Sequence, residues 1–321
     1  MAEMLNAFVH TLKFEAEGIL SIDLRPIAGG EFPPFEAGAH IDLHLPGGFV
    51  RSYSLLNDCQ ERHRYVVAVL KDKASRGGSR AVHEQLRIAM PLMLSEPRNN
   101  FALVEDAAHT VLVAGGIGVT PMLSMAQRLK QLGRSFEVVY CARSRRSAAF
   151  VNEMASVASQ VHWHFDDEEG TSPDLQTLLA ARPGSGADGT HYYACGPAVM
   201  LDAFERSCAA LGYANAHIER FSAVEVAPAS DAQQTYTVTL KRSGQTLTVL
   251  PGQSLLATLQ AAQIDCSTSC EEGICGACET RVLEGTPDHR DSVLSPAEQA
   301  SNQVMMVCVS GCKSQHLMLD L

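Results

Sequence analysis

The sequence lacks several features that would assign the protein to a membrane, a secretory route or nucleic acid. Residues 1–10 hold no basic stretch followed by an apolar core, so no signal peptide is expected. No run approaches the roughly 18 apolar residues that a membrane span needs. Lys and Arg number only 25 against 36 acidic residues, a formal net charge of −11, whereas nucleic-acid binding needs clustered cations. We therefore expect neither a membrane nor a nucleic-acid partner.

A second metal-binding pair beside the C-terminal cysteines is also lacking, and this absence bears on the chain's ten cysteines. Cys270, Cys275 and Cys278 form a C-x4-C-x2-C run, and Cys308 follows about thirty residues later. A zinc site usually adds a second C-x2-C or an H-x3-H pair, and neither follows the cysteine run in this sequence. A disulfide framework is the other alternative, but nothing marks the chain as secreted, so we expect reduced thiols and a cytoplasmic location. The spacing is that of a plant-type [2Fe–2S] centre, with these four cysteines as ligands.

Small residues inside the cysteine run support this interpretation. Gly273, Gly276 and Ala277 carry little or no side chain. Backbone N–H groups can therefore approach the sulfur atoms of a cluster and tune its potential.

The first hundred residues predict a small antiparallel barrel. Residues 39–45 alternate between apolar and polar, and residues 50–55 and 65–70 are rich in strand-forming side chains. Short strands separated by turn residues are typical of such barrels. Arg76-Gly77-Gly78-Ser79 precedes an expected helix over residues 80–87, and glycine N–H groups at a helix N-terminus can hold a phosphate. Such a run can also be no more than a turn.

The middle of the chain predicts a parallel α/β sheet. A continuous apolar strand at 110–113 leads into a glycine-rich loop and a helix, for which Thr120 suits the N-cap and Gly133 the C′ position. Strands at 136–140 and 191–195 follow, the latter before a helix of about fourteen residues ending near Gly212. Strands alternating with helices place a ligand at the C-terminal ends of the strands. The loop is not G-x-G-x-x-G, so it could also be a packing device.

The last hundred residues begin with a small, polar, non-periodic segment, 222–234, that is typical of a linker. Residues 235–241 and 246–250 then predict a hairpin, and Ser254 begins a helix that leads to the cysteine run.

Taken in this order, these motifs resemble the phthalate dioxygenase reductase family, whose members supply electrons to Rieske-type aromatic-ring oxygenases and demethylases. The resemblance covers essentially the whole chain. It rests on the four cysteines and on residues 51–55, 76–79, 114–122, 195–197, 219–221, 288–291 and 307–310. It implies an FMN-binding β-barrel domain (1–105), an NAD(P)H-binding α/β domain (106–224), a linker (225–234) and an α+β [2Fe–2S] ferredoxin-like domain (235–321).

The resemblance also implies roles for particular residues. The FMN ring and ribityl chain would be held by Arg51, Ser52, Tyr53 and Ser54, and the ring edge would be lined by Ala68 and Val69. The FMN phosphate would be bound by Gly77, Gly78 and Ser79, and Phe221 would pack beside the ring. NAD(P)H would contact Gly115, Gly116, Gly118 and Thr120, together with Cys195, Gly196 and Pro197. Two positions depart from the family's pattern: Leu70 replaces a common basic residue, and Ser222 a common glycine.

The chemistry of electron transfer favours the same assembly. A nicotinamide delivers two electrons as a hydride, a cluster accepts one, and a flavin can do both. We therefore predict a reductase component that passes electrons from NADH through FMN and a [2Fe–2S] cluster to a Rieske-type oxygenase, acts as a monomer and needs no catalytic side chain. The alternatives are an FAD-containing reductase of similar layout and a redox sensor or electron carrier without nicotinamide turnover.

Charged residues near two strand ends bear on the choice of nicotinamide. Asp166-Asp167-Glu168-Glu169 would repel the 2′-phosphate of NADPH, whereas Arg143, Arg145 and Arg146 could attract it. We expect NADH to be preferred to NADPH.

Overall fold

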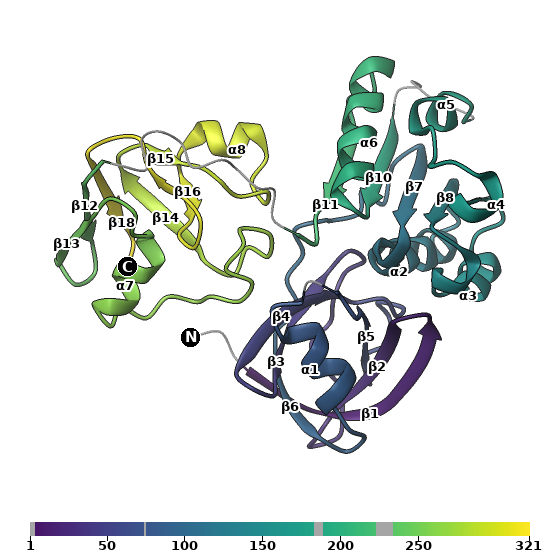
Figure 1. Ribbon diagram of the computed structural model, residues 1–321, viewed down its shortest axis with the longest axis horizontal. Helices are drawn as coiled ribbons and strands as arrows, with labels where there is room; N and C mark the ends of the chain where they lie inside the picture. The colour runs from purple at the N-terminus through teal and green to yellow at the C-terminus, as the bar shows by residue number, and fades with distance from the viewer. Residues whose placement is uncertain (1–3, 74, 183–188, 223–233) are drawn as a thin grey trace. The chain divides into compact units, whose positions relative to one another are not determined.

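Two compact units make up the chain, Ala2–Phe221 and Ser222–Leu321. The computed structural model describes residues 4–73, 75–182, 189–222 and 234–321 (Figure 1). The predicted linker, 225–234, lies outside the described residues except for Gln234. No described helix has the length and apolarity needed to cross a membrane.

The larger unit begins with a six-stranded antiparallel sheet that curls beneath helix α1 (Gly78–Gln85) (Figure 1). Alternating apolar residues form this sheet, because every second side chain enters its core; Ile41 and Leu43 are fully buried there. The expected strands are found within one residue of their predicted bounds, and the helix begins two residues early. In spatial order the strands are β4 (Phe49–Ser54), β3 (His40–Leu45), β6 (Pro91–Ser95), β1 (Met4–Ala16), β2 (Ile19–Pro26) and β5 (Tyr65–Leu70).

A five-stranded parallel sheet follows in the same unit. Its continuous apolar strands are buried on both faces, as parallel sheets require. The spatial order is β11 (Ala216–Glu219), β10 (Thr190–Cys195), β7 (His109–Gly115), β8 (Phe136–Ala142) and β9 (Val161–Phe165). Helices α2 (Val119–Gln131) and α3 (Val151–Val157) cover one face, and α5 (Leu175–Ala180) and α6 (Ala198–Leu211) the other.

The helix after the glycine loop starts earlier than predicted. A 3-10 turn, η1 (Gly116–Gly118), runs directly into α2, whose N-cap is Gly118. The prediction of Thr120 as N-cap is therefore wrong: Thr120 lies in the first turn, where its hydroxyl donates to the Ile117 carbonyl at 3.0 Å. Both expected glycine ends are found, since Gly133 follows α2 with φ +65° and Gly212 follows α6 with φ +74°.

The two sheets of the larger unit share one core. Ala68 of β5 belongs to the same buried cluster as Met122 of α2. The Glu17 N–H donates to the Arg146 carbonyl at 2.9 Å, and the Ser124 hydroxyl donates to the Asn57 carbonyl at 3.3 Å. These contacts fix one sheet against the other.

The smaller unit contains a five-stranded mixed sheet in the order β13 (Thr246–Val249), β12 (Tyr236–Leu240), β18 (His316–Leu319), β14 (Glu279–Glu284) and β16 (Val304–Met306). A short ladder joins β15 (Pro287–Asp288) to β17 (Gly311–Cys312). Helix α7 (Leu255–Ala261) is capped by the Ser254 hydroxyl, and α8 (Pro296–Ser301) by a Ser295–Glu298 capping box. The predicted fold class, an antiparallel flavin-type sheet, a parallel sheet and a C-terminal α+β domain, is confirmed.

Candidate functional site

The four cysteines of the smaller unit lie together as two pairs of sulfur atoms. Cys270, Cys275 and Cys278 come from the loop before β14, and Cys308 comes from the turn after β16. The Sγ atoms of Cys278 and Cys308 are 3.1 Å apart, and the Cys270 and Cys275 thiols are hydrogen-bonded to each other. Four thiols grouped two by two and largely shielded from solvent fit a [2Fe–2S] cluster, in which four cysteines hold two irons.

The backbone of the loop turns its N–H groups toward these sulfur atoms. The Glu272 N–H donates to Cys270 Sγ at 3.3 Å, and the Gly273 N–H reaches Cys308. Gly273 has φ +69°, and a Cβ atom there would lie 2.6 Å from the Val309 side chain. The predicted need for a residue without a side chain at this position therefore has a steric and a conformational cause.

Asp291 supports the cysteine loop, a role that the sequence did not reveal. Its buried carboxylate accepts the N–H groups of Val293 (3.3 Å) and Leu294 (2.9 Å). The adjacent Ser292 N–H donates to the Gly273 carbonyl at 2.9 Å. Residues 291–294 thus hold the loop that carries three of the cysteines.

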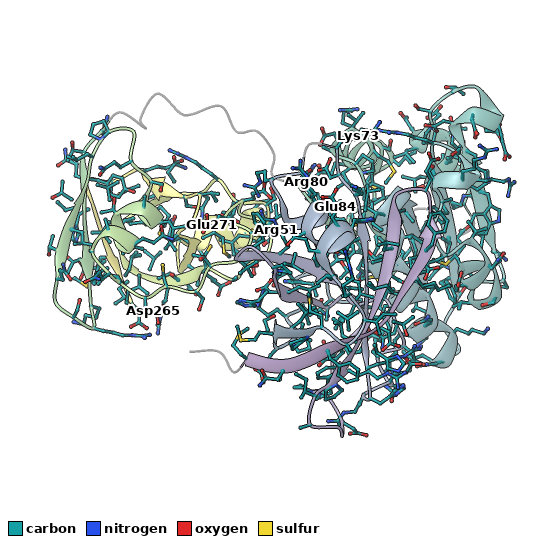
Figure 2. All side chains as sticks on the ribbon, turned by 60° about the horizontal axis from the view of Figure 1, so that its bottom comes forward. Arg51, Lys73, Arg80, Glu84, Asp265 and Glu271 are labelled. Atoms are coloured by element: carbon teal, nitrogen blue, oxygen red, sulfur yellow. The ribbon has the colours of Figure 1, made fainter. Side chains whose placement is uncertain are left out.

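Exposed acids surround the cysteine loop. Asp265, Glu271 and Glu279 are exposed, and Figure 2 marks the first two. The only cation of residues 265–298 besides Arg281 is Arg290, whose guanidinium is bound to Asp288 at 2.5 Å. The surface near the loop is therefore strongly negative.

In the larger unit, the residues expected to bind a flavin phosphate come together. Arg51 of β4 lies against the start of α1, and Figure 2 shows it beside that helix, which carries Arg80 and Glu84. A Cβ atom at Gly78 would lie 2.6 Å from the Arg51 side chain, and one at Gly77 would lie 2.2 Å from the Phe49 ring. A guanidinium next to a helix N-terminus fits a phosphate.

The other predicted flavin residues of the barrel lie on β4 and β5. Burial raises the pKa of Tyr53 to about 12, opposed by the nearby Arg51 charge. Ser52 instead donates its hydroxyl to Asp42 at 2.6 Å, so that hydroxyl already has a partner within the protein. On β5, Ala68 and Val69 are buried, and the Val69 carbonyl contacts the His83 ring at 2.9 Å. Helix α1 therefore contacts both β4 and β5.

A carboxyl group lies at the junction of the two sheets. Ser54 ends β4 and donates to Glu219 Oε2 at 3.4 Å, and Glu219 ends β11. The carboxyl group is buried although the residue as a whole is partly exposed, and this burial raises its pKa to about 8. Burial, with a smaller effect of Glu219, also raises the pKa of Cys195 well above its ordinary value. Burial therefore favours the protonated form of the Glu219 carboxyl.

The expected nicotinamide residues lie on two touching loops at the C-terminal edge of the parallel sheet. A Cβ atom at Gly118 would lie 2.1 Å from the Cys195 carbonyl oxygen, and one at Gly196 would lie 2.9 Å from Gly115 Cα. Gly116, with φ +55°, has open space around it. Met200 fills the gap beside Gly115 and Gly196, a contact that the sequence did not predict. The loops thus bring backbone and a helix N-terminus to the edge where such sheets bind ligands.

Phe221 follows β11 closely, just beyond Glu219. The residue is 38% exposed. Arg220, between them, is held by Asp202 at 3.0 Å and Glu205 at 2.6 Å. An exposed aromatic ring beside a fixed arginine suits a planar ligand.

Comparison with protein families gives two matches. Residues 112–206 match the oxidoreductase NAD-binding domain, and residues 238–313 match the 2Fe-2S iron-sulfur cluster binding domain. The second match spans all four cysteines.

Whole-chain relatives are also found. The chain is 48% identical to phenoxybenzoate dioxygenase subunit beta of Ectopseudomonas oleovorans, over 98% of this chain and 96% of the relative. It is 44% identical to vanillate O-demethylase oxidoreductase of Pseudomonas sp. strain HR199, over 99% and 100%. Among solved structures, phthalate dioxygenase reductase superposes with a TM-score of 0.71 at 36% identity, covering 99% of this chain and 98% of that one.

Proposed function

This chain belongs to the phthalate dioxygenase reductase family, and from that membership we propose that it is the reductase component of a Rieske-type oxygenase or demethylase. It is an oxidoreductase that joins an NAD-binding domain to a [2Fe–2S] domain. One observation carries the proposal: a single chain holds the four grouped cysteines, the two loops that meet at Gly118 and Cys195, and Arg51 beside the start of α1, where a phosphate would fit.

Within this proposal, FMN is the flavin. When bound, it accepts two electrons as a hydride and passes them on singly. Arg51 and the Gly77–Ser79 turn bind its phosphate, and Phe221 covers its ring. An FAD site must also house an adenosine, and a phosphate seat formed by Arg51 with the start of α1 supports the smaller cofactor. FAD is the alternative.

We assign the domains as FMN-binding for 1–105, NAD(P)H-binding for 106–224 and cluster-binding for 235–321, joined by 225–234. Tyr53, Ser54, Ala68 and Val69 line the flavin site, while Ser52 contributes through its backbone. The nicotinamide is held by the two loops that meet at Gly118 and Cys195, with NADH preferred to NADPH. Glu219 and Ser54 hold a proton at the junction. We further propose that the protein is a monomer. We also propose a cytoplasmic location, because thiolate ligands require a reducing compartment.

Identification of the released flavin and a comparison of two electron acceptors test the proposal. Denaturation should release FMN rather than FAD. NADH should support the reduction of two acceptors. Ferricyanide can take electrons from the flavin, and cytochrome c takes them from the cluster. A protein that held the cluster but did not oxidise NADH would be a sensor or carrier instead.

A further inference from the structure

Three arginines stand where a dinucleotide-binding sheet often has an acid. In such folds, an acid near the end of the second strand contacts the ribose 2′-OH of NAD, and an arginine nearby accepts the 2′-phosphate of NADP. Here β8 is the strand after the glycine loop and its helix, and it is followed by Arg143, Arg145 and Arg146. Taken alone, this segment favours NADPH.

The missing acid is supplied by the neighbouring strand. Helix α4 (Asp166–Glu169) begins where β9 ends, and β9 pairs in parallel with β8. Both carboxylate oxygens of Glu168 accept hydrogen bonds from Arg145: Oε1 from Nε at 2.6 Å and Oε2 from Nη2 at 3.3 Å. This two-point contact occupies one edge of the guanidinium, the edge that could otherwise grip a phosphate.

Other contacts also hold Arg145 in place. Its guanidinium carbon lies 4.4 Å from the centre of the Phe165 ring, the last residue of β9. Its backbone lies in the 3-10 turn η2 (Arg145–Ser147), which Ser144 and Ser147 close with a capping box. The Asp167 N–H donates to the Arg143 carbonyl at 3.1 Å, which ties the two strand ends together. Arg145 is therefore held between an aromatic ring and a carboxylate.

We propose that Glu168 is a specificity-determining residue that excludes NADPH by occupying Arg145. This inference rests on the proposed function, because it requires the nicotinamide cofactor to lie along this edge. The side chains of Arg145 and Glu168 are 60% and 46% exposed, so the ion pair adds little to stability. Its effect is on recognition: a 2′-phosphate would lose the Nε–Nη2 edge of Arg145 as a two-point donor and would meet the carboxylate charge.

Two variants of α4 separate this role from general electrostatics. Glu168→Gln removes one negative charge and breaks the two-point ion pair with Arg145, leaving at most one neutral hydrogen bond to the amide oxygen. Glu169→Gln removes the same charge from the adjacent residue, which forms no ion pair within the part of the chain that the structure describes. Combining Glu168→Gln with Arg145→Gln removes the released donor again.

Steady-state turnover and equilibrium binding give independent measurements on the flavin-loaded protein. The first is the ratio of kcat/KM for NADPH to that for NADH, with ferricyanide as acceptor. The second is the ratio of affinities for adenosine 2′,5′-bisphosphate and AMP, measured by calorimetry; these ligands differ only in the 2′-phosphate.

Glu168→Gln should raise both ratios about tenfold, the scale of one charge-assisted hydrogen bond. Glu169→Gln should change either ratio by less than about twofold, as expected of a solvent-screened charge. The double variant should return to the wild-type ratios. Equal shifts in the two single variants, or no shift in Glu168→Gln, would overturn the inference. Because the binding ratio needs no turnover, a protein that fails to oxidise NADH would refute the proposed function without deciding the role of Glu168.

Discussion

Replacement of Glu219 by glutamine should make the stability of the larger unit less dependent on pH. Burial raises the pKa of the Glu219 carboxyl to about 8, and the Ser54 hydrogen bond offsets this only in part. In the unfolded chain the same group titrates near its ordinary value of 4.5. The folded pKa is the higher one, so the stability contributed by the neutral carboxyl is complete below 4.5 and is lost as pH rises to about 8. Glutamine keeps a carbonyl acceptor for Ser54 and does not ionise.

The size of the effect follows from the two pKa values. The interval between 4.5 and about 8 corresponds to about 5 kcal/mol if solvent never reaches the group. Glu219 is partly exposed as a residue, so we expect about half of that, roughly 2–3 kcal/mol, because water screens part of the cost.

Urea unfolding between pH 5 and pH 9 measures this difference. The fluorescence of Trp163, the sole tryptophan, reports on the unit that contains Glu219. The free energy of unfolding of Glu219→Gln should gain roughly 2–3 kcal/mol on the wild type as pH rises across this range. The matched control is Glu36→Gln, which removes an exposed carboxyl in the same unit. Parallel pH profiles for wild type and Glu219→Gln would refute the reasoning.

Three further changes test other parts of the account. Cys275→Ser should abolish cytochrome c reduction and spare NADH-driven ferricyanide reduction; loss of both with the flavin would contradict separate folding of the cluster domain. Gly118→Ala should lower kcat/KM for NADH at least about tenfold, because a Cβ atom would lie 2.1 Å from the Cys195 carbonyl and force the two loops apart. Glu271→Gln with Glu272→Gln should weaken the salt dependence of electron transfer to the oxygenase in stopped-flow measurements without altering the visible spectrum, since their charges steer the encounter. A wild-type rate that does not change with salt would exclude such steering.

Features that depend on local sequence were predictable. The cysteine spacing fixes which thiols can meet, and only Cys308 comes from a distant segment. The glycines after α2 and α6 end their helices because the left-handed conformation is cheap for that residue. The start of α2 was misplaced, because the 3-10 turn at Gly116–Gly118 moves the cap from Thr120 to Gly118.

Features that depend on contacts between distant segments were not predictable. Ser54 and Glu219 are 165 residues apart and meet only because the two sheets pack together. The hydrogen bond from the Ser52 hydroxyl to Asp42 follows from strand pairing, since β3 and β4 place these residues opposite each other. Arg145 and Glu168 appeared in the sequence as opposing clusters, and the alignment of β8 with β9 turns them into one ion pair.

An anaerobic NADH titration of the purified protein tests the central claim most directly. A flavin accepts two electrons and a [2Fe–2S] cluster one, whereas each NADH supplies two, so full reduction should require about 1.5 NADH per chain. The visible spectrum should show both the flavin and the cluster becoming reduced, and electron paramagnetic resonance should detect the reduced cluster. Saturation at about one NADH per chain with the cluster still oxidised would contradict an electron path from nicotinamide to iron within this chain.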